Sequence, residues 1–401
     1  MSAPVAAKMA LDRSAFRETL KVLGVRAEGK QIGQIVKQFS QHLLNRPKLR
    51  NVVPLAAAPH KLVLLAESID GLESSPVDLQ EYIKNQNLSV QTHEITLDYS
   101  FWGVDHVLRK LLPESITEIP SSFETIGHIA HLNLREFHLP YKHLIGQVIL
   151  DKNEPRIKTV VNKTDTIDTV FRTFPMEVLA GEDNMVVELN ESGCHFTFNF
   201  AQVYWNSRLQ QEHLRMIRQF DPKKDVICDM MCGIGPFAVP LAKKGCTVYA
   251  NDLNPKSYEY LQLNRAKNKV EANLHPFNMD GRAFLHKLLD DRIQFTQVLM
   301  NLPAIALEFL DAFPGRFDHW EGELPYIHTY CFSSQVDAPE KDVQERAEAI
   351  LGAPLDMTTT TIYQVRDVAP KKLMMCISFQ LPAAAAFSEE KRQGLKRMKL
   401  E

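Results

Sequence analysis

The sequence lacks the features that mark membrane-spanning and strongly basic proteins. It has no run of about eighteen apolar residues, the length that a membrane-spanning helix needs, and its first residues lack the apolar core of a secretory signal. Its formal net charge of −3 is close to zero, so any basic surface must be local. We therefore expect no membrane partner, and the total charge by itself indicates no nucleic-acid partner.

Cysteine is scarce, and its spacing fits neither a zinc site nor a disulfide framework. No Cys-x-x-Cys pair occurs, so we interpret the thiols as reduced and the compartment as reducing. Four histidines lie close together in the sequence, but their carboxylate partners and spacing are weak for a metal site, and we predict none. The residues concerned are Cys194, Cys228, Cys232, Cys246, Cys331 and Cys376, and His128, His131, His138 and His143.

The length of 401 residues predicts two or three domains, and the composition, 45% hydrophobic and 24% charged, is ordinary for a globular protein. A segment rich in proline and serine, 112–122, is interpreted as a linker. The predicted parts are an N-terminal docking module (1–111), a middle α/β domain that contributes to the reaction pocket (112–204), a cofactor domain (205–387) and a charged tail (388–401).

The first 111 residues predict a small α/β module without recognisable chemistry. Helices are expected at about Arg13–Leu23 and Lys30–Leu44, and strands at Lys61–Leu65 and Val90–Leu97. Such a module would bind a partner or position a large substrate.

The segment before the cofactor domain predicts a hairpin and then a long helix. Val186–Leu189 and His195–Phe198 alternate like strands around a turn, and a helix is expected from Asn199 to about Phe220. Within that helix Arg208 and Glu212 are four residues apart, which places them on one face and predicts an ion pair.

The rest of the chain is arranged around a strand, a glycine turn, a helix and a second strand in residues 225–255. Val226–Met230 is a short apolar run typical of a buried parallel strand, and Pro236–Lys244 predicts a helix. Thr247–Ala250 is the second strand, and Asp252 follows it. A carboxylate at that position can accept hydrogen bonds from both ribose hydroxyls of an adenosine.

The glycine turn, with Gly233 and Gly235, differs from the turns that hold phosphates. It lacks the third glycine of a dinucleotide-binding turn, and no lysine followed by serine or threonine comes after it. Asp229, just before the glycines, would repel a pyrophosphate but suits a cation. S-adenosylmethionine carries a sulfonium and an amino group and no phosphate, so we predict a class I methyltransferase core that uses this cofactor. The alternative is that the glycines form only a turn and that Asp252 is only a solvated strand end.

Strands and helices continue to alternate after this unit, and the pattern ends in two strands at Thr358–Val368 and Leu373–Leu381. We therefore predict an α/β fold, a class I (Rossmann-like) methyltransferase domain whose mainly parallel sheet ends in an antiparallel hairpin. Smaller α/β domains precede it in the chain.

Polar residues follow the third and fourth predicted strands, where the ligands of an open α/β sheet bind. Asp280 and Gly281 follow the third strand, and Asp280 can accept a hydrogen bond from the adenine amino group. Asn301-Leu-Pro-Ala follows the fourth strand and precedes a predicted helix through Phe313. The Asn301 amide, held rigid by Pro303, suits a planar nitrogen nucleophile. Methyltransferases of amino and ring nitrogens carry (Asn/Asp)-Pro-Pro-aromatic at this position. In the present sequence, other residues replace one proline and the aromatic residue.

Four motifs in order resemble the tRNA (guanine-37 N1)-methyltransferase family of eukaryotes and archaea. The resemblance covers about residues 120–381 and is looser in the N-terminal module. The motifs are Phe-Arg-Thr-Phe…Glu-Val-Leu-Ala-Gly-Glu (171–182), Val-Tyr-Trp-Asn-Ser-Arg-Leu-Gln-Gln-Glu-His (203–213), Asp-Met-Met-Cys-Gly-Ile-Gly-Pro-Phe-Ala-Val-Pro (229–240) and Asn-Leu-Pro-Ala…Glu-Phe-Leu (301–310).

The resemblance implies a role for individual residues. Glu212 would be the general base for the N1 proton of guanine, Arg172 would stabilise negative charge on O6, and Asn301 would orient the base. Arg172 stands among apolar residues, where an unpaired arginine is costly, which independently indicates a paired or functional side chain. His213 takes the place of an archaeal arginine for the methionine carboxylate. The implied cofactor-binding residues are His213, Asp229, Gly233, Asp252, Leu253, Asp280, Gly281 and Asn301, and the substrate-binding residues are Tyr204, Arg208 and Pro303.

The family also implies tRNA with G37 as the substrate, docked by the N-terminal module, and a monomer in the cytosol with nuclear and mitochondrial pools. An aminocarboxypropyl transferase of wyosine synthesis shares the fold and the cofactor, and it is the alternative enzyme. A catalytically silent tRNA-binding subunit and a methyltransferase of proteins or small molecules are further alternatives. The intact Glu212, Asp252, Asp280 and Asn301 argue against a silent subunit.

Overall fold

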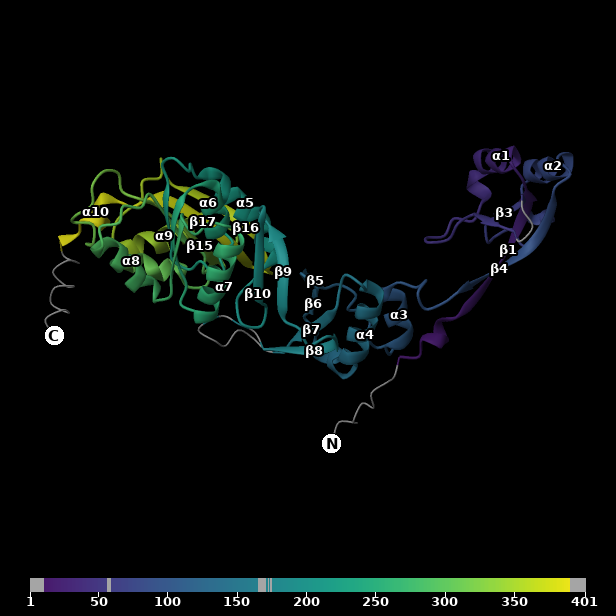
Figure 1. Cartoon of the computed structure of the whole chain (residues 1–401), viewed down its shortest axis with the longest axis horizontal. Coiled ribbons are helices and arrows are strands. Elements are labelled where there is room, and N and C mark those ends of the chain that lie inside the picture. Colours follow the sequence, from purple (N-terminus) through teal and green to yellow (C-terminus); the bar gives the residue numbers. More distant parts are fainter. Residues whose placement is uncertain (1–10, 56–58, 165–170, 172, 174, 390–401) are drawn as a thin grey trace, which may run out of the picture. The chain divides into compact units, whose positions relative to one another are not determined.

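The computed structural model describes residues 11–55, 59–164, 171, 173 and 175–389, which fall into two compact units. The first unit comprises residues 1–122 and 134–154, and the second comprises 123–133 and 155–401 (Figure 1). Arg172 and nearly all of the predicted charged tail lie outside the described residues. Within the described ranges, no helix is long and apolar enough to cross a membrane.

The first unit contains an antiparallel sheet in the order β2-β3-β1-β4. Helices α1 and α2 contribute Ile35, Leu79 and Ile83 to its core. The strands are β1 (Glu18–Ala27), β2 (Val52–Pro54), β3 (Lys61–Leu64) and β4 (Ser89–Leu97), and the α-helices are α1 (Lys30–Gln38), α2 (Val77–Asn85), α3 (Val104–Leu111) and α4 (Lys142–Asn153). Short 3₁₀ helices are η1 (Arg13–Phe16), η2 (Ser40–His42), η3 (Leu72–Ser74) and η4 (Glu136–Tyr141).

The predicted helix over residues 13–23 is wrong, because η1 ends at Phe16 and β1 begins at Glu18. Leu23, Val25 and Ala27 enter one buried cluster, whereas Val22 enters another. Both faces of β1 are therefore covered, and its apolar residues do not show the simple alternation of a half-exposed strand. The predicted helix over 30–44 is confirmed only to Gln38, after which η2 follows.

The second unit contains a seven-stranded sheet in the order β13-β12-β11-β14-β15-β17-β16. The first five strands in this order pair in parallel, and β17 pairs antiparallel with both β15 and β16. This order confirms the predicted α/β fold with a terminal antiparallel hairpin. The strands are β11 (Val226–Asp229), β12 (Thr247–Asn251), β13 (Leu274–Phe277), β14 (Gln297–Met300), β15 (Tyr326–Ser333), β16 (Thr361–Ala369) and β17 (Lys372–Gln380).

Helices connect these strands, and short 3₁₀ segments stand at two places where the sequence predicts α-helix. The helices are α5 (Gln210–Gln219), α6 (Ala238–Lys244), α7 (Pro255–Lys267), α8 (Gly281–Asp290), α9 (Pro339–Leu351) and α10 (Ala383–Ala386). The predicted helix through Phe313 is the 3₁₀ helix η6 (Ala306–Ala312). The predicted helix from Asn199 is wrong before Gln210, where α5 begins after η5 (Ser207–Leu209).

The late start of α5 follows from the burial of the segment before it. Val203 and Trp205 are buried in the core, and Asn206 caps η5 by accepting a hydrogen bond from the Arg208 N–H at 3.1 Å. An extended segment can bury residues that are two positions apart, whereas an amphipathic helix buries residues three or four apart. Residues 200–202 form a turn after β10, and Val203 and Trp205 belong to the non-helical segment that follows this turn.

The second unit also holds a smaller four-stranded sheet and a separate hairpin. The small sheet has the order β5-β6-β7-β8, and the hairpin joins β9 to β10. The hairpin confirms the prediction for residues 186–198. The strands are β5 (Glu124–Ile126), β6 (Ile129–Leu132), β7 (Thr159–Lys163), β8 (Met176–Gly181), β9 (Val186–Glu191) and β10 (Cys194–Asn199).

Helix α7 binds the edge of β10 through two asparagines one turn apart. Asn264 Oδ1 accepts from the Thr197 N–H at 2.8 Å, and Asn268 Oδ1 accepts from the His195 N–H at 2.9 Å. Asn264 Nδ2 also donates to the Ile234 carbonyl at 3.2 Å. The same helix therefore holds both the hairpin and the glycine turn, and it satisfies backbone groups that a strand edge would otherwise leave unpaired.

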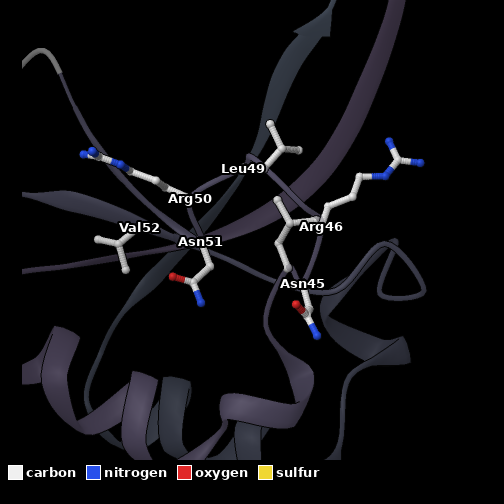
Figure 2. A pocket seen from close by; sticks show the side chains of 7 residues that line it. Asn45, Arg46, Leu49, Arg50, Asn51 and Val52 are labelled. Atoms are coloured by element: carbon white, nitrogen blue, oxygen red, sulfur yellow. The ribbon is translucent and has the colours of Figure 1, made fainter. Parts of the chain in front are cut away.

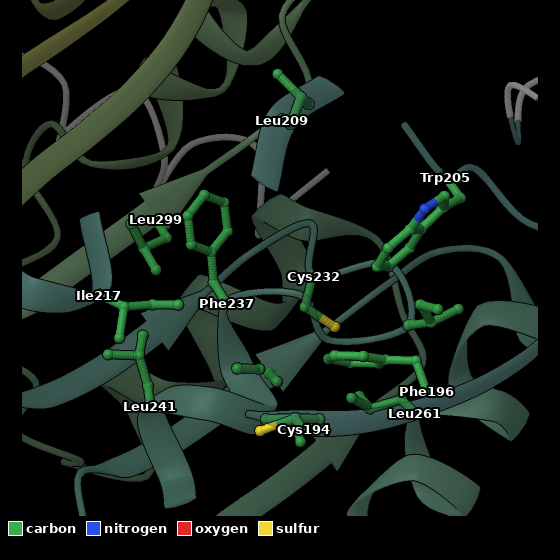
Figure 3. Packing of buried hydrophobic residues seen from close by; sticks show 14 of the residues in the cluster. Cys194, Phe196, Trp205, Leu209, Ile217, Cys232, Phe237, Leu241, Leu261 and Leu299 are labelled. Carbon is green, nitrogen blue, oxygen red and sulfur yellow. The ribbon is translucent and has the colours of Figure 1, made fainter. Parts of the chain in front are cut away.

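One hydrophobic cluster joins the hairpin to the large sheet. Figure 3 shows side chains from β10, α5, the glycine turn, α6 and α7 gathered together in this cluster. They include Cys194 and Phe196, Ile217, Cys232 and Phe237, Leu241, and Leu261. The apolar parts of the glycine turn are therefore fixed in the core.

The buried His328 of β15 makes the stability of the second unit depend on pH. Its ring nitrogens lie 2.8 Å from Ser378 Oγ and 3.0 Å from Gln297 Oε1, and burial, with the charge of Arg215, lowers its pKa to about 4. The folded ring stays neutral as the pH falls below about 6.5, whereas the unfolded ring takes up a proton. Stability is therefore lost as the pH falls from about 6.5 to about 4, and the loss at pH 5 is about 2 kcal/mol.

Urea unfolding at pH 7 and pH 5 measures this effect. The difference between the two free energies should shrink in His328→Gln and remain in His319→Gln, a control at an exposed histidine of the same unit. An unchanged difference in His328→Gln would contradict the assignment.

Candidate active site

The glycine turn after β11 requires glycine at two positions. Gly233 and Gly235 have φ angles of +55° and +96°, which favour glycine. A Cβ atom on Gly235 would lie 2.7 Å from Val239 Cγ2 and 2.8 Å from Leu261 Cδ1. The turn therefore packs directly against α6 and α7, and the predicted strand, turn, helix and strand are confirmed.

Asp252 lies against this turn, as the sequence predicts. Its Oδ2 accepts a hydrogen bond from the Gly233 N–H at 2.8 Å, and its Oδ1 accepts from the Asn254 N–H at 2.9 Å. Burial raises the pKa of Asp252, and these backbone donors oppose part of that rise. The neighbouring Leu253 is 46% exposed, so a large apolar side chain faces solvent beside the carboxylate.

Asp229, at the end of β11, is fully buried. Neither carboxylate oxygen has a hydrogen-bond partner of ordinary geometry among the described residues. Burial and the negative charge of Asp252 raise its pKa well above the usual value, although the Met231 N–H opposes this. An unpaired buried carboxyl group is costly unless a ligand supplies a donor or a positive charge. This residue therefore fits the cationic ligand that the sequence predicts.

Asn251, which the sequence analysis missed, connects two loops at the carboxyl edge of the sheet. Its Nδ2 donates to the Met230 carbonyl at 3.1 Å and to the Met279 carbonyl at 2.9 Å. Its Oδ1 accepts from the Met279 N–H at 3.0 Å. The last residue of β12 thereby aligns the loops that follow β11 and β13. Its position before Asp252 is the only sequence signal, and it does not reveal these partners.

Asp280 and Gly281 stand at the start of α8. Asp280 Oδ1 caps the helix by accepting from the N–H groups of Arg282 and Ala283, at 2.9 and 3.2 Å. The side chain is exposed. A Cβ atom on Gly281 would lie 3.1 Å from the ring of Phe309, so a larger residue would crowd this edge. The cap fixes the carboxylate and leaves Oδ2 for another donor.

Asn301 follows β14 at the same edge of the sheet. Its Oδ1 is buried and has no hydrogen-bond partner in the described part of the chain. The Pro303 carbonyl accepts from the Phe332 N–H at 3.0 Å, which ties the loop to β15. Because Met300 pairs with Thr329 in parallel register, Asn301 lies at the level of Tyr330. The structure thus presents an unused amide oxygen at the strand end.

Glu212 reaches this edge through Tyr330, but its ionic partner differs from the prediction. The Tyr330 hydroxyl donates to Glu212 Oε1 at 2.8 Å, and Glu212 is only 6% exposed. Arg215 donates to both carboxylate oxygens at 2.6 Å. The predicted pair with Arg208 is wrong, because Arg208 lies in η5 ahead of α5 and its side chain is exposed.

His213 lies beside the glycine turn and is paired with Glu191, a partner that the sequence analysis missed. Its Nδ1 is 2.5 Å from Glu191 Oε1, and both side chains are buried. The ring contacts Phe237 edge-on, with centroids 4.8 Å apart. A carboxylate on Nδ1 fixes the orientation of the ring. Glu191 and His213 are 22 residues apart and lie on different elements, so spacing alone could not indicate the pair.

Tyr204 and Arg208 lie on the segment that leads into α5, and both are exposed. The Tyr204 hydroxyl accepts from Asn206 Nδ2 at 3.4 Å. Ser207 Oγ donates to Glu124 Oε1 at 2.6 Å, which anchors η5 to the small sheet. Burial lowers the pKa of His131, and the charge of Arg208 contributes to that shift. The structure therefore places these two predicted substrate contacts at the solvent side. The predicted role of Arg172 lies outside the described residues.

Among the residues that the structure describes, no group of three or more histidine, cysteine, aspartate or glutamate side chains could hold a metal ion. The six cysteines are buried and free.

The sheet order and the polar groups at its carboxyl edge define a class I, Rossmann-like methyltransferase domain. Residues 187–349 match the TRM5/TYW2 methyltransferase domain, and residues 104–184 match the TYW2 N-terminal domain. A protein of Phytophthora infestans named tRNA (guanine(37)-N(1))-methyltransferase is 60% identical over 395 residues, covering 96% of this chain and 95% of the relative. The chain belongs to the family of tRNA (guanine(37)-N(1))-methyltransferases, which has the domain that TRM5 and TYW2 proteins share.

A more distant relative carries the same name, and two solved structures share the fold. A Dictyostelium discoideum protein of the same name is 42% identical, covering 93% of this chain and 82% of the relative. Trm5b from Pyrococcus abyssi has a TM-score of 0.63 at 24% identity, covering 89% of this chain and 98% of that one. The structure of aTrm5 with tRNALeu has a TM-score of 0.66 at 22% identity, covering 90% of this chain and all of that one. These structural similarities support the fold.

Proposed function

We propose that the protein transfers a methyl group from S-adenosylmethionine to N1 of guanosine 37 in tRNA. The observation that carries the proposal is the 60% identity to a tRNA (guanine(37)-N(1))-methyltransferase over nearly the whole of both chains. The arrangement of Glu212 and Asn301 at one edge of the sheet supports it, because the reaction needs a proton acceptor and a group that orients a base.

The proposed cofactor site follows the strand ends. Asp252 would accept the ribose hydroxyls, and the buried Asp229 would compensate the positive charge at the methionine end. His213, oriented by Glu191, would bind the methionine carboxylate. When bound, the cofactor supplies an electrophilic methyl group. The remaining contacts in the proposal come from Gly233, Leu253, Asp280, Gly281 and Asn301.

The proposed chemistry at guanine includes the removal of one proton. The N1 proton of guanine is weakly acidic, so Glu212 would accept it while Arg172 stabilises negative charge on O6. Asn301, whose Oδ1 is unused, would hold the guanine edge, with Pro303 keeping its loop rigid. Tyr204 and Arg208 would contact the base from the solvent side.

The first unit would dock the tRNA away from the anticodon. A hollow in it is lined by Asn45, Arg46, Arg50 and Asn51 (Figure 2). Figure 2 shows Arg46 and Arg50 extending to opposite sides of this hollow. Lys48, in the same loop, donates to the Phe101 carbonyl at 2.8 Å. Arginine and lysine side chains on such a loop suit phosphate oxygens, and this local basic patch fits a chain of low net charge.

The alternative enzyme is an aminocarboxypropyl transferase. The match of residues 104–184 to a TYW2 N-terminal domain favours it. The structure of Pyrococcus horikoshii TYW2 with MeSAdo also resembles the chain, with a TM-score of 0.53 and 23% identity, but covers only 69% of it. The longer and closer match to a methyltransferase outweighs both. A monomer, and a cytosolic location with nuclear and mitochondrial pools, belong to the proposal as well.

Methyl-labelled S-adenosylmethionine and two tRNA transcripts, with G37 or A37, test the proposed function. We expect label in the G37 transcript alone. Label in both transcripts would contradict guanosine 37 as the target, and tight tRNA binding without label would indicate a silent subunit or transfer of another group.

A further inference from the structure

The carboxylate of Glu212 is held asymmetrically. Oε1 accepts hydrogen bonds from Arg215 Nη2 at 2.6 Å and from the Tyr330 hydroxyl at 2.8 Å. Oε2 accepts one, from Arg215 Nε at 2.6 Å. A carboxylate oxygen has two acceptor positions, so within the described residues Oε1 is filled and Oε2 keeps one position.

We propose that Arg215 and Tyr330 are positioning residues that hold Glu212 with one open acceptor position, on Oε2, for the proton that it removes. The inference rests on the proposed function, which makes Glu212 the base. It identifies the carboxylate oxygen that accepts the proton and the two side chains that orient the carboxylate. The proton would leave N1 of guanine and bind Oε2, its bonding electrons would stay on N1, and Glu212 would become a neutral acid beside the Arg215 cation.

The terminal hairpin of the sheet holds this arrangement. In the strand register Tyr330 pairs with Cys376, and Cys376 pairs with Tyr363, so the three residues form a row across β15, β17 and β16. Tyr330 binds Glu212, and the ring of Tyr363 lies 4.2 Å from the guanidinium carbon of Arg215. The ion pair of Glu212 and Arg215 on α5 therefore lies along this row. Tyr330 holds Glu212 at one end, and Tyr363 contacts Arg215 at the other.

The surroundings of Glu212 keep Arg215 charged and the Tyr330 hydroxyl protonated. Hydrogen bonds to Glu212 raise the pKa of Arg215, and burial raises the pKa values of Tyr330 and Cys376, with the charge of Glu212 adding to both shifts. Arg215 thus stays a cation and Tyr330 stays a donor in the working range of pH. Two fixed donors on one carboxylate limit its rotation, which is what a base needs to meet a proton at one position.

The test compares Arg215→Gln with Arg218→Gln. Arg218 is exposed on the same helix, so the control removes an equal charge without touching Glu212. Single-turnover methylation of the G37 transcript would be measured with saturating tRNA and cofactor, beside their dissociation constants. We expect Arg215→Gln to be about tenfold slower or more with both dissociation constants unchanged, and Arg218→Gln to match the wild type. Arg215→Lys should recover part of the rate.

A double variant separates positioning from a general structural effect. If Arg215 acts through Glu212, then Glu212→Gln/Arg215→Gln will be no slower than Glu212→Gln, whereas independent effects would multiply. Tyr330→Phe removes one hydroxyl and should also slow the reaction without changing cofactor binding, and thermal melting of each variant monitors folding.

Two results would overturn the inference: equal rates for Arg215→Gln and Arg218→Gln, or multiplied effects in the double variant. Failure of the wild type to methylate G37 would instead overturn the proposed function, and this inference with it.

Discussion

Replacing Glu212 with glutamine is expected to slow methylation of guanosine 37 by about 10²-fold or more, while cofactor binding stays nearly unchanged. Glutamine has nearly the same size and can still accept from Tyr330, but its amide cannot take up the N1 proton. Glu212 Oε1 lies 2.8 Å from the Tyr330 hydroxyl, beside the strand end that carries Asn301. The proposed reaction needs its proton acceptor at this place. Single-turnover rates with saturating tRNA measure the proton-transfer and methyl-transfer step directly.

The control for this variant is Glu271→Gln, at an exposed glutamate of the same unit. It should methylate at the wild-type rate. Because Glu212→Gln also removes the charge partner of Arg215, circular dichroism and cofactor titration must show that the variant is folded. Normal turnover in a folded Glu212→Gln would exclude Glu212 as the base.

Asp252→Ala is expected to weaken cofactor binding by about 10²-fold, through the loss of two charge-assisted hydrogen bonds to the ribose. The variant also removes the hydrogen bond that Asp252 accepts from the Gly233 N–H at 2.8 Å, so the glycine turn loses a stabilising contact. Isothermal titration with S-adenosylmethionine gives the dissociation constant. At saturating cofactor the methylation rate should recover, because Asp252 takes no part in proton removal.

The matched control is Asp291→Ala, which removes an exposed carboxylate at the end of α8. Its affinity should equal that of the wild type. Unchanged affinity in Asp252→Ala would show that the ribose lies elsewhere, whereas a loss in both variants would indicate an effect of total charge.

The large sheet and the polar residues at its edge could be predicted because their signals are local. A short apolar strand, a glycine turn and a carboxylate after the next strand stand within about 30 residues, and the structure brings Gly233 and Asp252 together at the predicted edge of the sheet. The terminal hairpin was predicted for the same reason. By contrast, the sequence predicts a helix over the first part of β1, because both faces of this strand are buried and the alternation of a half-exposed strand is lost.

The partners of the site residues could not be predicted, because they depend on contacts between distant elements. Glu212 and Tyr330 are 118 residues apart, and His213 meets Glu191 across the start of α5 and the end of β9. Even the local choice between Arg208 and Arg215 depended on where α5 begins. Spacing of four residues favours Arg208, but α5 begins only after the non-helical segment and η5, which leaves Arg208 outside the helix.

Identification of the nucleoside formed at position 37 tests directly whether the protein methylates N1 of guanosine. The G37 transcript would be incubated with the protein and S-adenosylmethionine, digested to nucleosides and separated beside standards, with identification by mass. We expect N1-methylguanosine, formed by the wild type and strongly reduced in Glu212→Gln. A guanosine carrying an aminocarboxypropyl group, or a methyl group on another atom, would contradict it.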